Sequence, residues 1–133
     1  MVVYTNQSSS EISQASVGTV DPSDNSISFG TAATYDSSSG TSHNAATFDT
    51  NSNKVAIVYR DLYSGGGHGK SRVGTVSGTD ITFGTEVTFE SADTQHIECA
   101  FDSSNNKVVV AYHDAGNSSY GTAIVGTISG TDI

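Results

Sequence analysis

The 133-residue sequence has little of several residue types that mark common protein classes: no tryptophan, one proline and one cysteine. The single cysteine, Cys99, excludes an intramolecular disulfide. It stands where Ala46 stands in a matching segment, so we expect a small buried side chain. No Cys/His cluster offers several metal ligands at fixed spacing, and we therefore expect neither a metal ion nor a cofactor.

Basic residues are also scarce, with five Lys and Arg against fourteen Asp and Glu and a formal net charge of -9. A polyanion would be repelled by this charge, which argues against nucleic acid as a partner. No stretch approaches the roughly 18 consecutive apolar residues of a membrane span. We expect a soluble protein. The sequence does not determine its location, and a virion-associated or extracellular location is compatible with it.

An internal repeat of roughly fifty residues is the strongest signal in the sequence. The segment VGTV at Val17 returns as VGTV at Val73 and as VGTI at Val125. Likewise, KVAIVYRD at Lys54 matches KVVVAYHD at Lys107. The chain is therefore predicted to be a single repeat domain: a half repeat over 1–26, full repeats over 27–80 and 81–132, and the start of a further repeat at residue 133.

Each unit contains four short runs of β-branched and aromatic residues separated by Ser, Asn, Asp and Gly, which predicts four β-strands, a to d, and almost no helix. Strand a covers 27–35 and 81–89, and its alternating residues are expected to share one face of a sheet. Strand b ends at Phe48 and Phe101. Strand c covers 55–59 and 108–112, is apolar almost throughout, and is predicted to be covered on both faces. Strand d and strand a are separated by a turn at residues 77–80.

Four short strands per unit are typical of the blades of a β-propeller. We therefore predict an all-β, propeller-like repeat of four-stranded antiparallel blades, with a β-sandwich as the alternative and a parallel β-helix as a poorer one. About two and a half units cannot close a ring, so oligomerisation or a longer parent chain must complete it. The open strand edges favour self-association, with a dimer preferred.

The stretch from Val73 onwards carries a resemblance as well as a repeat. Its segments VGTVSGTDITFGTEVTFES and FDSSNNKVVVAYHDAGNSSYGTAIVGTISGTDI resemble repeated segments of uncharacterised marine viral and environmental proteins. That resemblance implies a propeller-type fold and no particular activity. A looser similarity to sialidase-type propellers lacks their S-x-D-x-G-x-T-W motif, and no sialidase chemistry is carried over.

Polar residues recur at equivalent places in the repeat. His43 and His96 each lie five residues before the phenylalanine of strand b, and Arg60 and His113 each follow the tyrosine of strand c. Such recurrence can reflect a ligand site in each blade or one hydrogen-bond arrangement reused in each, and the second interpretation is favoured. The candidate ligand-binding residues, with two tyrosines expected on exposed loops, are His43, His96, Arg60, His113, Tyr63 and Tyr120; His68 and Asn117 are further expected contacts.

Nothing in the sequence indicates catalytic machinery. The G-x-S-x-G nucleophile motif is absent, and acidic residues such as Glu86, Glu90 and Glu98 show no pattern specific to glycoside hydrolysis. The sequence therefore favours a non-enzymatic structural or binding module that presents loops to a glycan or a protein. The alternative is a degenerate sialidase-like glycoside hydrolase, which would need an arginine cluster, and Arg60 and Arg72 are the only arginines.

Overall fold

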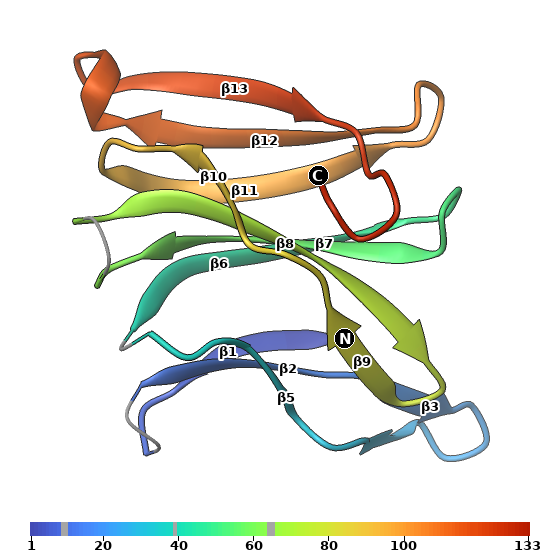
Figure 1. The fold of residues 1–133 in the computed structure, drawn as a ribbon. Helices are drawn as coiled ribbons and strands as arrows, with labels where there is room; N and C mark the ends of the chain where they lie inside the picture. Colours follow the sequence, from blue (N-terminus) through green and yellow to red (C-terminus); the bar gives the residue numbers. More distant parts are fainter. Residues whose placement is uncertain (9–10, 39, 64–65) are drawn as a thin grey trace.

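A computed structural model describes residues 1–8, 11–38, 40–63 and 66–133, and the regular secondary structure of these residues is almost entirely β-strand (Figure 1). The helical content of those ranges is one 3-10 turn, η1 (Ala115–Asn117). None of their segments is a helix long and apolar enough to cross a membrane. The all-β class and the near absence of helix are confirmed, whereas closure into a propeller remains a prediction.

The strands form three layers stacked on one another, which we number in chain order (Figure 1). The first layer contains β1 (Val2–Asn6), β2 (Ile12–Ser16), β3 (Gly18–Asp21), β4 (Ser26–Phe29) and β5 (Ala33–Asp36). The second contains β6 (Thr41–Asp49), β7 (Lys54–Asp61), β8 (His68–Ser77), β9 (Asp80–Phe83) and β10 (Val87–Glu90). The third contains β11 (Thr94–Asp102), β12 (Lys107–Asp114) and β13 (Tyr120–Gly126).

The second layer is an antiparallel meander whose five strands occupy four positions. β6 pairs with β7, β7 pairs with β8, and β9 and β10 follow one another along the free edge of β8. The predicted turn at 77–80 is a two-residue hairpin in which Ser77 pairs with Asp80 and Gly78 has a φ of +62°. Strand a, which is β9 and β10, therefore belongs to the same sheet as the preceding strand d, which is β8. The next sheet begins after β10.

β7 lies at the centre of the core, and each of its faces packs on a different layer. Ala56 and Val58 pack against the third layer, while Val55, Ile57 and Tyr59 pack against the first. We call the face that carries Ala56 and Val58 the upper face, and the opposite face the lower face, because the third layer is uppermost in Figure 1. All five residues are at most 4% exposed. The prediction of a strand covered on both faces is confirmed for 55–59.

The same prediction is wrong for 108–112 in β12. Val108, Val110 and Tyr112 are buried against the second layer, but Ala111, on the upper face, is exposed. The two strands have nearly the same sequence. Their burial differs because the third layer has a packed neighbour on its lower face only.

Strand a also departs from expectation, because it is two short strands rather than one. β9 and β10 are separated by residues 84–86, and this interruption reverses the alternation of side chains between the two faces. Phe83 packs in the core on the lower face, whereas Phe89 packs in the core on the upper face. The prediction that alternate residues of 81–89 share one face is therefore wrong.

Cys99 is only partly buried, packed beside the core between the second and third layers. Burial raises the pKa of its thiol to about 12, and the neighbouring charge of Glu98 acts in the same direction. An ordinary thiol has a pKa of about 8.5, so the native chain at pH 8 should react with an aromatic disulfide reagent about a thousandfold more slowly than a free thiol. The reaction is followed by absorbance, with the guanidinium-unfolded chain as the control. Equal rates in the two states would contradict the environment described for Cys99.

Candidate functional site

Two histidines occupy identical β-bulges near the beginning of β6 and of β11. Between Ser42 and Ala45 the pairing of β6 with β7 gains one residue, and the same shift occurs in β11 between Gln95 and Glu98. The extra residue leaves the regular ladder and changes the direction of the side chains, as bulges commonly do near functional sites. His43 and His96 have left-handed φ values of +50° and +51° in these bulges. The shared backbone geometry gives the two exposed imidazoles equivalent positions.

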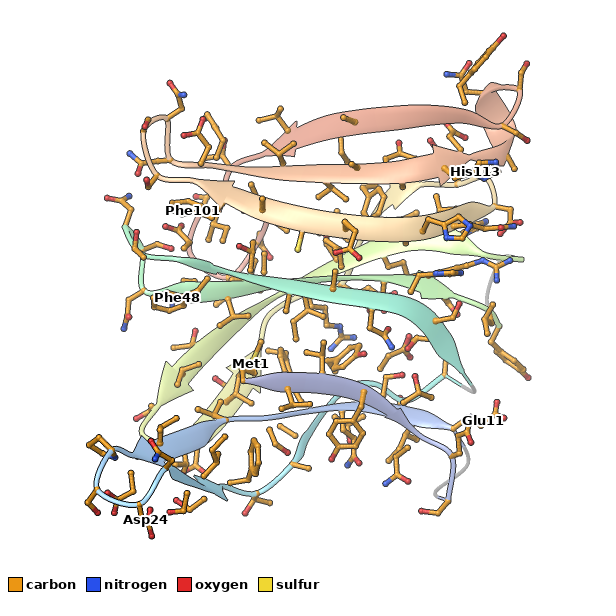
Figure 2. The ribbon with its side chains drawn as sticks, turned by 180° about the vertical axis from the view of Figure 1, so that it is seen from behind. Met1, Glu11, Asp24, Phe48, Phe101 and His113 are labelled. Atoms are coloured by element: carbon orange, nitrogen blue, oxygen red, sulfur yellow. The ribbon has the colours of Figure 1, made fainter. Side chains whose placement is uncertain are left out.

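The imidazole rings of His43, His96 and His113 lie in a row. The rings of His43 and His96 are 5.2 Å apart between centroids and tilted by 60°, and the rings of His96 and His113 are 6.4 Å apart and nearly perpendicular. We call these three residues the histidine row. Figure 2 labels His113 at this end of the third layer and Phe48 and Phe101 at the opposite end of the strands.

Arg60 and Asp93 form an ion pair that is only partly shielded from solvent. Arg60 donates from Nε to Oδ1 of Asp93 at 2.8 Å, and Gln95 donates from Nε2 to Oδ2 at 3.1 Å. Burial by itself raises the pKa of Asp93, but the hydrogen bonds from Arg60 and Gln95 outweigh it and hold that pKa below its usual value. Asp93 therefore stays ionised and holds the Arg60 side chain in one orientation.

The surroundings of His43 favour its neutral imidazole. Burial lowers the pKa of His43, and the charges of His96 and Arg60 add to this effect against the opposing charge of Asp93. A neutral imidazole offers one hydrogen-bond donor and one acceptor in addition to its flat ring. In His113 the Nδ1 atom is buried and has no hydrogen-bond partner among the described residues. The histidine row thus presents flat rings together with a polar atom, His113 Nδ1, that has no hydrogen-bond partner among the described residues.

Of the six candidate ligand-binding residues, the structure brings four together. His43, His96 and His113 form the row, and Arg60 contributes to the electrostatics of His43. Tyr63 is 72% exposed on the connection that follows β7, whereas Tyr120, expected on a loop, is the first residue of β13 and is 66% exposed. Within the described ranges, neither tyrosine takes part in the ring contacts of the row.

The additional contacts suggested by the sequence differ from each other in exposure: Asn117 is exposed in η1, while His68 is half-buried at the beginning of β8. Among the residues that the structure describes, His43 and His96 do not share the hydrogen-bond arrangement expected to be reused at them. Neither imidazole makes a hydrogen bond to another residue in the described part of the chain. The two rings instead lie beside each other, tilted by 60°.

Sequence reasoning missed Asp93, which orients Arg60. The repeat could not reveal it, because the residue before Thr94 is Asp93 whereas the residue before the matching Thr41 is Gly40. The sequence did contain one indication of this pair, which is charge: Asp93 is an acidic residue in the connection that leads into β11, and Arg60 is a basic residue at the end of strand c. Searching for charge complementarity between neighbouring repeats would have found it.

A second polar cluster lies inside the fold, between the first and second layers. Lys70 Nζ is 2.6 Å from Asp61 Oδ2 and 2.7 Å from Glu86 Oε1, and Tyr59 donates to Glu86 Oε2 at 2.7 Å. Burial alone lowers the pKa of Lys70, but hydrogen bonds to Asp61 and Glu86 raise it overall. Burial also raises the pKa of Tyr59, as does its hydrogen bond to Glu86. These four residues, which we call the buried ion network, all belong to the second layer and link β7 and β8 to the connection between β9 and β10.

A hollow of about 540 Å³ lies between the first and second layers at the opposite end of the strands from the histidine row. Phe48, Val55 and Val76 are among its lining residues. Within the described ranges, no Asp, Glu, Lys, Arg or His side chain lines it. The described residues also contain no group of three or more His, Cys, Asp or Glu side chains placed to hold a metal ion.

Comparisons of the chain with protein-family models, with curated proteins and with solved structures gave no match.

Proposed function

We propose that the three layers are successive blades of a β-propeller and that the chain is a non-enzymatic binding module. Its ligand site is the histidine row together with Arg60, the connection that carries Tyr63 and the beginning of β13 at Tyr120. The observation that carries this proposal is the convergence of His43, His96 and His113 at one end of the layers. Function commonly lies on loops at one end of a rigid sheet scaffold.

The chemistry of the row favours a glycan over a protein as the ligand. Sugar hydroxyls both donate and accept hydrogen bonds, which matches the neutral imidazole of His43 and the Gln95 amide. The C–H faces of a sugar ring pack on flat side chains, and His43 and His96 present theirs to solvent. A protein ligand that contacts Tyr63 and Tyr120 is the other outcome of the proposal.

The placement of the two arginines supports a binding role over glycoside hydrolysis. Arg60 follows Val58 by two residues in β7, so both side chains lie on the upper face. Arg72, in β8, pairs with Ile57, so both side chains lie on the lower face. Arg72 is 3.8 Å from Glu86, beside the buried ion network. An arginine cluster of the kind a sialidase-like site needs is therefore not formed by these two residues.

A glycan array followed by titration of the best ligand tests the proposal. Each of His43→Ala and His96→Ala should weaken binding about tenfold, since each removes one hydrogen-bonding ring from the row. Asn51→Ala is the control, because Asn51 is exposed in the turn between β6 and β7, at the opposite end of the strands from the row, and the affinity of this variant should equal that of the wild type. Absence of any glycan or protein ligand would contradict the proposal, and release of product from the bound glycan would favour the hydrolase.

A further inference from the structure

The two outer layers each expose an apolar sheet face. On the upper face of the third layer, Ala111, Ala123 and Val125 are exposed, and Val125 reaches 65%. On the lower face of the first layer, Ile27 and Phe29 are 56% and 53% exposed. These are the uppermost and lowermost surfaces in Figure 1. Apolar surface concentrated on one sheet face commonly marks an interaction site.

The chain makes the same layer-to-layer interface twice, as its aromatic pairs show. Between the first and second layers, the rings of Tyr35 and Tyr59 are 5.2 Å apart and tilted by 57°. Between the second and third layers, Phe89 and Tyr112 occupy the matching positions, with rings 5.4 Å apart and the same tilt of 57°. In both cases an upper face of one layer meets a lower face of the next.

A backbone contact is repeated in the same way. Gly30 of the first layer lies against Thr79, in the hairpin turn of the second layer. Gly84 of the second layer lies against Thr131, in the corresponding turn of the third. A side chain at either glycine would collide with the threonine, so the glycines allow the close approach of neighbouring layers. The sequence thus encodes one kind of interface and uses it for every pair of neighbouring layers.

The exposed upper face of the third layer and the exposed lower face of the first layer correspond to the two faces that pack together at this interface. Val125 pairs with Val109 across β12 and β13 as Val73 pairs with Ala56 across β7 and β8, yet Val73 and Ala56 are fully buried.

The lower face of the first layer shows the corresponding difference in exposure. Ile27 pairs with Val20 as Ile81 pairs with Val76, and the exposed fraction is 56% for Ile27 but 5% for Ile81. The third layer therefore leaves its upper face uncovered, and the first layer leaves its lower face uncovered. These are the two kinds of face that pack together between neighbouring layers of the chain.

We infer that the upper face of the third layer of one molecule packs on the lower face of the first layer of a second copy, head to tail. Such an interface joins different surfaces of the two copies, and it continues until a ring closes or a filament forms. The inference depends on the repeated interface and not on a ligand at the histidine row. It also differs from pairing at the strand edges that β1 and β13 leave free, since side chains of the sheet faces make the contact.

Two variants that each block one face test the inference by light scattering coupled to size exclusion. Val125→Lys places a charge on the upper face of the third layer, and Ile27→Lys places one on the lower face of the first. Both positions are exposed in the single chain, so both variants should fold. Each is expected to weaken association at least about a hundredfold, because the interface would bury an unpaired ammonium group. Leu62→Lys, at an exposed apolar residue on a connection, is the matched control and should associate like the wild type.

Mixing the two variants gives the decisive result. Each retains one intact face, so an equimolar mixture should form a heterodimer and stop there, while each variant alone stays monomeric. A wild-type chain that remains monomeric at every concentration would overturn the inference. So would association that survives both substitutions, which indicates pairing through strand edges, or association lost with Val125→Lys but kept with Ile27→Lys, which indicates a symmetric contact between identical faces.

Discussion

A Lys70→Met variant is expected to lose about 3–5 kcal/mol of its free energy of unfolding, the usual cost of removing one partner from a buried ion pair. Lys70 is the cation that faces both Asp61 and Glu86, and Asp61 is fully buried. Methionine keeps most of the volume and removes the charge, so the loss arises from electrostatics and not from a cavity. Urea unfolding monitored by circular dichroism measures the effect.

Lys107→Met is the control for this prediction. Lys107 Nζ donates to Thr127 Oγ1 at 2.6 Å in an exposed position, and the substitution should change stability by less than about 0.5 kcal/mol. A loss of less than about 1 kcal/mol for Lys70→Met would show that water hydrates the carboxylates at little cost, contrary to the packing described.

The pH dependence of the same variant identifies the cause of its instability. Burial by itself raises the pKa of Glu86, but hydrogen bonds from Lys70 and Tyr59 outweigh it and lower that pKa overall. Glu86 therefore contributes stability above the ordinary carboxyl pKa of about 4.3 and loses that contribution as the pH falls through its folded-state value. Without Lys70 this contribution is smaller, so stability should fall less steeply below pH 5 in the variant than in the wild type.

Gly30→Ala is the second substitution with a large expected effect, a loss of about 1–3 kcal/mol from overpacking. A Cβ atom at Gly30 would lie 2.6 Å from Thr79 Cβ and also against the Thr79 carbonyl oxygen, so the backbone of a tight turn would have to move. The effect is steric, and it should appear as a lower urea midpoint with an unchanged dependence on denaturant.

Gly121→Ala is the matched control, since a Cβ atom there meets nothing within 4 Å. It should leave the midpoint unchanged or raise it slightly, because alanine reduces the conformational freedom of the unfolded chain. Equal effects of the two substitutions would mean that the first two layers do not approach each other closely at Gly30.

Local sequence specified the strands well but could not determine which faces are buried. Residues 55–59 and 108–112 have almost the same apolar pattern, and both form the predicted strand. Whether the upper face is buried depends on a neighbouring layer, and only β7 has one there. This information is tertiary, so two similar segments acquire different environments.

The interruption of strand a and the buried ion network escaped prediction for a related reason. The alternation in 81–89 looks regular, and only the three-dimensional pairing shows that 84–86 leave the ladder. Glu86 lies in this interruption, where it meets Tyr59 and Lys70. The position of Lys70 is taken by Gln14 in the first repeat and by Thr122 in the last, so comparing repeats gives no sign of the network.

For the candidate site, equivalence between repeats was informative. It identified His43 and His96, which the bulges bring into contact, and Arg60 and His113, which occupy the same position in β7 and β12. It did not reveal the bulges, because a left-handed φ at histidine leaves no mark in a polar sequence. The tyrosines were chosen for exposure alone, and exposure gives no information on whether they approach the row.

The unequal neighbourhoods of the three layers also bear on how the chain comes apart. β7 is covered above and below, so its amide hydrogens become accessible to solvent only when the whole molecule opens. The first and third layers are each covered on one side, and either can detach while the other stays in place. Unfolding should then proceed from the outer layers toward β7, as in proteins built from stacked repeats, and a second copy docked on an outer layer would slow the first step.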